Sequence, residues 1–168
     1  PLQFLTQVRA VPTLTVQEAK PNFQLMYYGY KITRPMVADK RVREAMSIAI
    51  NRKAMVKGIM LGNAEPTTTY VEPAAADYNP ETAGIIKEDV ERAKKLLDEA
   101  GWKPGADGIR EKDGVKMKFT CSTTAGNVAR QNTQQLFQQN WKKIGVEMEI
   151  KNMPASVVWG EYTIKSQY

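Results

Sequence analysis

Apolar residues along this chain repeat with a helical period in some segments and alternate with polar residues in others. Val42, Ala45, Met46 and Ala49 have the i, i+3, i+4, i+7 spacing of one buried helix stripe. Asp39 stands just before this stripe, and its carboxylate can accept hydrogen bonds from the first helical turn. The pattern therefore predicts an amphipathic helix that begins after Asp39.

Two further helical runs are expected before residue 102. Asn51 is placed to cap the first run and Gly62 to end it. The apolar positions of this run are Met55, Val56, Ile59 and Met60. The second run begins at Asp89 and is followed by Gly101, a left-handed stop after which Trp102 can pack back on the helix. Its buried face is expected to carry Val90, Ala93, Leu97 and Ala100.

The segment between these runs, residues 62–84, shows no sustained period and is expected to be a loop. A loop of this length in a compact domain is usually functional or packed against another part of the protein. The first twenty residues are expected to be irregular. Residues 23–30 are rich in aromatic side chains on both faces, which predicts a strand buried on both sides. Within it, Tyr27, Tyr28 and Tyr30 are interpreted as core or hinge residues.

The second half of the chain has the order strand, helix, strand. Asp113-Gly114 can close a hairpin, and the apolar residues Val115, Met117, Phe119 and Cys121 then alternate with polar ones, as in a strand with one solvated face. A helix is expected over residues 127–144, with inward residues Ala129, Leu136, Phe137, Trp141 and Ile144. Gly145 ends it before a strand that carries Val146, Met148 and Ile150. This order predicts a right-handed βαβ unit with parallel strands, hence an α/β fold.

A final helix is expected near Pro154, with Val157, Val158 and Tyr162 as its apolar positions and Trp159 as a packing residue.

The chain has 168 residues, 42% of them hydrophobic and 25% charged, which fits one soluble globular domain. No apolar run approaches the roughly 20 residues of a membrane-spanning helix, and no basic-then-apolar signal segment precedes the domain. The start at Pro1 favours a processed or excised piece.

Charge and residue types narrow the possible chemistry. The net charge of +6 suggests a nucleic-acid partner. Positive and negative residues alternate along the helix after Asp89, however, as on a solvated face, so no nucleic acid is expected as a partner. The chain contains no histidine, which removes Ser/His and Cys/His nucleophile pairs. Cys121 is the only cysteine and is interpreted as a small apolar strand residue, with a reactive thiol as the alternative. We expect no cofactor, no metal and no enzyme; a hydrolase with paired carboxylates is the remaining catalytic alternative.

A ligand site is predicted where the first parallel strand ends. Ligands of parallel α/β sheets lie beyond the carboxyl ends of the strands. The loop there leads into a helix whose free amides and side chains can hold a carboxylate or a carbonyl group. The predicted ligand-binding residues are Ser122, Thr123, Thr124, Asn127 and Arg130. The alternative is that the polar residues of this loop only cap the helix.

Three motifs, in order, resemble one family. They are Asp39-Lys-Arg-Val-Arg-Glu-Ala45 with Ala49-Ile-Asn-Arg52 and Gly62-Asn-Ala-Glu-Pro66, then residues 88–102, then residues 141–150. Together they resemble the extracytoplasmic solute-binding proteins of family 5, the dipeptide/oligopeptide class, which deliver ligands to ABC importers. The resemblance covers roughly residues 20–165. One departure is Lys31, which stands where the family often has Asn after the aromatic strand.

The resemblance implies a periplasmic-binding-protein type II-like lobe. Residues 1–168 would form the C-terminal-side ligand-binding lobe of a longer two-lobed chain, periplasmic or anchored outside the membrane as a lipoprotein. The implied partners are a peptide or similar small solute, the second lobe and the permease subunits. In the family, the loop after Gly62 lines the cleft and an arginine near the start of the helix after residue 127 can contact ligand. This adds four predicted ligand-binding residues, with a solvent-exposed loop as the alternative: Thr67, Thr68, Thr69 and Tyr70.

Arg41 and Arg43, although part of the first motif, are expected to brace the lobe through ion pairs and helix packing rather than to touch ligand. A different class of function stays open beside the importer. An isolated α/β domain with an exposed cleft face could serve as a protein-interaction module.

Overall fold

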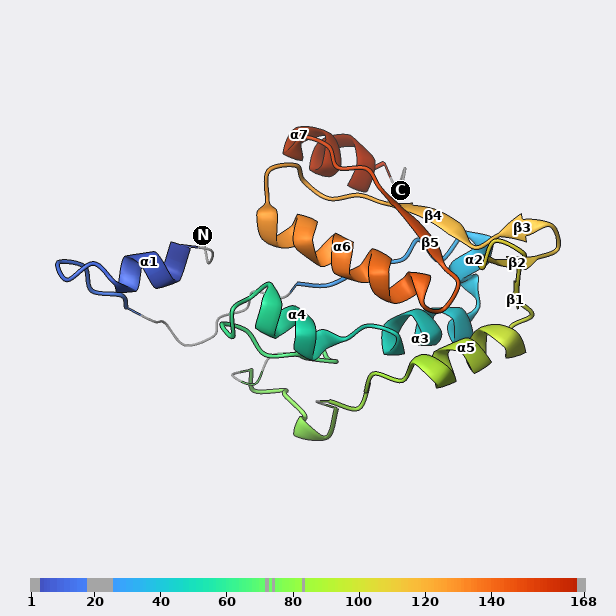
Figure 1. The fold of residues 1–168 in the computed structure, drawn as a ribbon, viewed down its shortest axis with the longest axis horizontal. Coiled ribbons are helices and arrows are strands. Elements are labelled where there is room, and N and C mark those ends of the chain that lie inside the picture. Colours follow the sequence, from blue (N-terminus) through green and yellow to red (C-terminus); the bar gives the residue numbers. More distant parts are fainter. Residues whose placement is uncertain (1–3, 18–25, 72, 74, 83, 166–168) are drawn as a thin grey trace. The chain divides into compact units, whose positions relative to one another are not determined.

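The computed structural model describes residues 4–17, 26–71, 73, 75–82 and 84–165 (Figure 1). The chain divides into two compact units. The first comprises Pro1–Tyr28 and Arg52–Ile85, and the second comprises Gly29–Asn51 and Ile86–Tyr168. All the buried apolar residues of the described ranges belong to the second unit. That residues 1–168 form one lobe of a longer chain stays a prediction.

The first helices of the second unit are α2 (Pro35–Ala38) and α3 (Lys40–Ile48). The Asp39 carboxylate accepts a hydrogen bond from the Arg41 backbone N–H at 2.8 Å, which confirms the predicted N-cap of α3. The Arg41 side chain also pairs with Asp39 and donates to the Glu99 carbonyl at 2.8 Å. Arg43 donates to the carbonyls of Val37 and Ala38. Both arginines therefore brace the helices, as predicted.

Helix α5 (Val90–Glu99) is capped at both ends as the sequence predicts. The Asp89 carboxylate accepts from the Arg92 N–H at 2.8 Å. Gly101 has a φ of 88°, and the Trp102 N–H donates to the Leu97 carbonyl at 2.9 Å. The Trp102 side chain is buried. Val90, predicted to be buried, is only half-buried, because the core side of α5 is carried by Ala93, Leu96 and Leu97.

The strands form two small sheets. The first sheet is antiparallel and consists of β1 (Lys103–Pro104), β2 (Arg110–Lys112) and β3 (Val115–Lys116). Asp113 and Gly114 have φ values of 51° and 76°, which suits a type I′ turn and confirms the hairpin. The second sheet pairs β4 (Lys118–Cys121) in parallel with β5 (Glu147–Ile150). Helix α6 (Val128–Lys142) connects these two strands, which confirms the βαβ order.

The single strand expected over residues 115–121 is wrong, because the chain changes partner at Met117. The Met117 N–H donates to the Arg110 carbonyl at 2.6 Å, whereas its carbonyl accepts from the Glu147 N–H at 2.9 Å. The residue thus leaves the hairpin and joins the parallel pair, and its side chain is fully buried. Val115, on the hairpin side of this break, is 58% exposed rather than inward.

Trp141 of α6 is at the centre of the core. Its ring is fully buried, and its indole N–H donates to the Met46 carbonyl of α3 at 2.8 Å. The rings of Phe119 and Phe137 lie 5.4 Å and 5.1 Å from it, measured between centroids. The inward face of α6 also contains polar residues that the sequence pattern did not reveal: Thr133, Gln134 and Asn140. Ala129, Leu136 and Phe137, predicted to face inward, are half-buried.

Arg110 is an unexpected core residue, with 4% of its surface exposed. Its guanidinium donates to the carbonyls of Ile144 and Trp102 at 2.8 Å and 2.6 Å, and to the Asp98 carboxylate at 2.7 Å. These bonds satisfy the buried cation and tie the end of α5 to the end of α6.

The second unit ends with α7 (Ala155–Val157) and the π-helical segment η3 (Val158–Thr163). Val158 is buried, as its place in the predicted final helix requires. Trp159 is 52% exposed, so its interpretation as a packing residue is wrong. Successive side chains of a helix point in different directions, and here the inward direction is taken by Val158.

The first unit contains α1 (Leu5–Arg9), α4 (Arg52–Gly58) and the 3₁₀ turn η2 (Pro80–Thr82). Helix α1 corrects the expectation that the first twenty residues are irregular. The helical run expected after Asn51 is confirmed as α4, but it ends at Gly58, before Ile59 and Met60, and its apolar residues are half-buried. The first unit has no buried apolar residue in its described ranges that could cover this face. None of the helices in the described ranges combines the length and apolar character needed to cross a bilayer.

The strand expected over residues 23–30 is not borne out where it can be seen. Residues 23–25 lie outside the described ranges, and residues 26–30 are not a strand. Met26 and Tyr27 are 42% and 68% exposed, so this stretch is not buried on both sides and Tyr27 is not a core residue. Aromatic β-propensity yields a strand only where a neighbouring strand completes the ladder, and the described strands pair among themselves.

Candidate functional site

The loop between β4 and α6 is the first candidate site. It continues the parallel ladder beyond the strands, because the Met153 N–H donates to the Thr123 carbonyl at 3.1 Å and the Ala125 N–H donates to the Met153 carbonyl at 2.8 Å. The Thr123 N–H also donates to the Asn152 side chain at 3.1 Å. The loop backbone is therefore anchored to the segment that follows β5.

The structure brings three of the predicted residues of this loop together. The Asn127 side chain accepts from the Arg130 N–H at 3.0 Å and so caps α6. The Thr124 hydroxyl, in a residue with only 7% exposure, accepts from the Arg130 guanidinium at 2.7 Å. Asn127 and Thr124 are thus already bonded to α6, and for Asn127 the alternative interpretation as a cap describes its contact.

Arg130 keeps donors available for a ligand. A guanidinium has five N–H donors, and the bond to Thr124 uses one of them. Among the described residues no carboxylate forms an ion pair with Arg130, whose side chain is half-buried at the first turn of α6. The hydroxyl of Ser122 is buried and has no hydrogen-bond partner in the described part of the chain. A held arginine with free donors can bind a carboxylate with two parallel hydrogen bonds.

In the first unit, the threonines predicted to bind ligand form hydrogen bonds within their own loop. The Thr68 hydroxyl donates to the Thr82 carbonyl at 2.7 Å and accepts from the Gly84 N–H at 3.0 Å. Thr67 bonds with the backbone of Thr69 at 3.2 Å in both directions. These contacts close the loop on itself. A ligand role for Thr67, Thr68 and Thr69 stays a prediction.

Tyr70 forms an exposed aromatic pair with Tyr27. The ring centroids lie 5.8 Å apart and the planes meet at 63°, an edge-to-face arrangement. Tyr27 and Tyr70 are 68% and 72% exposed. Tyr27 is therefore not the core residue that was expected, and a ligand role for Tyr70 stays a prediction.

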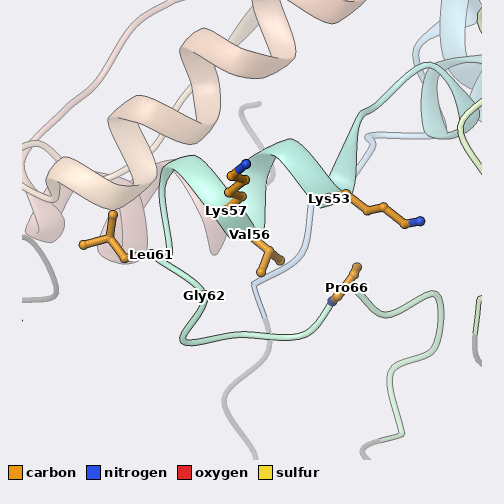
Figure 2. Close-up of a pocket in the computed structure, with 6 residues that line it drawn as sticks. All are labelled: Lys53, Val56, Lys57, Leu61, Gly62 and Pro66. Carbon is orange, nitrogen blue, oxygen red and sulfur yellow. The ribbon is translucent and has the colours of Figure 1, made fainter.

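A hollow of about 530 Å³ lies beside α4 (Figure 2). It is lined by residues of the helix and of the turn and loop that follow: Lys53, Val56, Lys57, Leu61, Gly62 and Pro66. The residue pattern gives no sign of this hollow, because two lysines on an amphipathic helix are typical of a solvated face. The apolar part of its lining, which includes Leu61 and Pro66, becomes apparent only once the turn after the helix is folded.

Comparison with known families identifies the chain. The family described as "Bacterial extracellular solute-binding proteins, family 5 Middle" matches residues 1–168. The chain belongs to this family. Family 5 proteins are solute-binding proteins.

Individual family 5 proteins support both the sequence and the fold assignment. Oligopeptide-binding protein AppA of Bacillus subtilis is 34% identical over 127 residues, 74% of this chain and 23% of AppA. The structure of AppA in complex with a nonapeptide has a TM-score of 0.75 at 30% identity, covering 79% of this chain and 27% of that one. The oligopeptide-binding protein of Thermus thermophilus, complexed with a pentapeptide, has a TM-score of 0.67 at 36% identity, covering 76% and 22%.

These matches confirm the predicted α/β, type II-like fold class. The chain spans about a quarter of the length of these relatives.

Proposed function

We propose that this chain forms part of the ligand cleft of a family 5 binding protein that carries di- and oligopeptides, or a similar small solute, to the permease of an ABC importer. The family assignment supports a solute-binding role, and the relatives from Bacillus subtilis and Thermus thermophilus are oligopeptide-binding proteins. The native protein would be extracytoplasmic, with a second lobe from the same longer chain. Its partners would be that lobe, the solute and the permease.

The position of the Arg130 side chain is the observation that best supports this proposal. Thr124 and Asn127 hold the first turn of α6 so that the guanidinium is positioned before any ligand arrives. An ordered arginine loses less conformational freedom on binding than a mobile one, which favours affinity. Its unused donors match the two oxygens of a carboxylate, a group that peptides always carry at one end.

The proposed mechanism is capture without chemistry. The solute carboxylate would bind Arg130, and no bond of the solute would be made or broken. Closure of a second lobe would remove water from the solute and increase its buried surface. One lobe alone leaves the solute exposed on one side, so weak binding is expected of this chain by itself.

Two titrations test the proposal. Calorimetry of the chain of 168 residues with di- and oligopeptides should show little heat, and submicromolar binding would contradict a half-cleft. In the full-length protein, Arg130→Gln should weaken peptide binding by about ten- to a hundredfold, the range for a charged hydrogen bond.

Lys142→Gln is the matched control, because it removes the same charge from the other end of α6. Equal effects of the two variants would reduce the role of Arg130 to net charge. An unchanged affinity in Arg130→Gln would remove Arg130 from the site.

A further inference from the structure

We propose that the hollow beside α4 binds a small apolar carboxylate, meaning an apolar group that bears one carboxylate. This proposal concerns the first unit and does not depend on Arg130. Lys53, Val56 and Lys57 have i, i+3, i+4 spacing, so they share one face of α4. Figure 2 shows Val56 on the side of the helix where the loop with Pro66 passes, with the Lys53 and Lys57 side chains extending away from it in different directions.

The lysines supply unneutralised positive charge. Lys53 and Lys57 are exposed, and no described carboxylate pairs with either of them. The residues that line the hollow include no acidic group. The hollow is therefore bordered by two lysines one helical turn apart, and its lining adds no negative charge.

The apolar wall is held in place by the turn after α4. Leu61 has a φ of 51°, a left-handed conformation that costs a non-glycine residue about 1–2 kcal/mol. Hydrogen bonds fix this turn, since the Gly62 N–H donates to the Val56 carbonyl at 3.0 Å and the Asn63 amide donates to the carbonyls of Met60 and Leu61 at 3.1 Å and 3.0 Å. Leu61 stays 49% exposed at the edge of the hollow. Conformations of this kind cluster at ligand-binding sites.

Size and charge identify the ligand class. The volume of about 530 Å³ lies within the range of small-molecule pockets, roughly 300–1,000 Å³. An apolar wall bordered by two lysines fits a ligand with one apolar and one anionic part. The carboxylate could come from the last residue of a peptide or from a free acid.

The test is a titration of the ¹⁵N-labelled chain, followed by the amide signals of α4 and residues 61–66. N-acetyl-leucine represents a peptide end and 4-methylpentanoate a free acid. We expect binding at about millimolar concentration for ligands of this size. N-acetyl-leucine amide, which lacks the charge, should bind about three- to fivefold more weakly. N-acetylglycine, which lacks the apolar part, should bind about tenfold more weakly. Equal binding of both acids supports a general carboxylate site, and tighter N-acetyl-leucine binding supports a peptide end.

Variants decide whether the hollow is responsible. Lys53→Gln/Lys57→Gln should abolish the charge preference, and Leu61→Asn, which tolerates the left-handed conformation, should weaken the apolar part of binding. Lys142→Gln/Lys143→Gln removes the same charge from the second unit and should change nothing. The proposal is overturned if the amide binds as well as the acid, or if the two double variants behave alike. Arg130→Gln should leave these shifts intact, so a failure here leaves the proposed function standing.

Discussion

Gly145, just after α6, lies where an added methyl group would meet the buried Arg110. The residue has a φ of 79°, and a Cβ atom there would lie 2.8 Å from Cγ of Arg110 and 3.1 Å from the Gly108 carbonyl oxygen. Gly145→Ala therefore carries two costs. The left-handed backbone costs about 1–2 kcal/mol for alanine. Overpacking against Arg110 adds about 1–3 kcal/mol, so we expect a total loss of about 2–5 kcal/mol of unfolding free energy.

Gly114→Ala separates the two costs. Gly114 has a φ of 76°, and an added Cβ atom would have no neighbour within 4 Å. This variant should lose only the backbone part, about 1–2 kcal/mol. Urea unfolding followed by tryptophan fluorescence measures both variants, because Trp102 and Trp141 are buried in the same unit. If Gly145→Ala is no less stable than Gly114→Ala, the packing argument around Arg110 is wrong.

Three further outcomes are expected. Asp89→Ala should lower the unfolding free energy by about 1 kcal/mol in urea titrations, and Asp89→Asn by less, because asparagine still caps α5. The Arg41 hydrogen bond lowers the pKa of Asp39, so its stabilisation is present above the ordinary carboxyl pKa and is lost as pH falls through the lowered value; between pH 5 and pH 3 the wild type should lose more stability than Asp39→Asn. Burial raises the pKa of the Cys121 thiol, so iodoacetamide should react more slowly with the native than with the urea-unfolded chain at pH 8, and equal rates would contradict burial.

Local signals in the sequence correctly predicted the starts of α3 and α5, the end of α5 and the hairpin, whereas α4 ends at Gly58 rather than at the predicted Gly62. Asp39 and Asp89 cap helices through contacts with residues two or three positions away, and Asp113-Gly114 forms a turn from its own backbone preference. Such contacts are local, so a single sequence contains the information needed to place them.

Features that depend on distant partners could not be predicted. Arg110 is buried because it meets Asp98, Trp102 and Ile144, which lie 12, 8 and 34 positions away. Met117 breaks a regular alternating pattern because its two backbone groups bond to different strands. In neither case does the spacing of apolar residues along the chain indicate the hydrogen-bond partner.

The candidate site shows the same limit. The sequence predicts Arg130 in the first turn of α6, but only the folded loop shows that Thr124 holds its guanidinium. The hollow beside α4 was missed, since its wall depends on the left-handed turn at Leu61. Thr67, Thr68, Thr69 and Tyr70 were chosen from residue type and family resemblance, and hydrogen bonds within the loop now account for the threonines.

The position of Arg130 depends on the core as well as on its own loop. Two parallel strands alone make a marginal sheet, so β4 and β5 rely on helix packing for stability. Trp141 provides that link, since its indole bonds to α3 and its ring packs on Phe119 of β4. Loosening this core would also move the loop at residues 122–127, which is anchored to the ends of both strands. Loss of solute binding in a core variant therefore does not identify a ligand contact, and only a variant such as Arg130→Gln that keeps its unfolding free energy can do so.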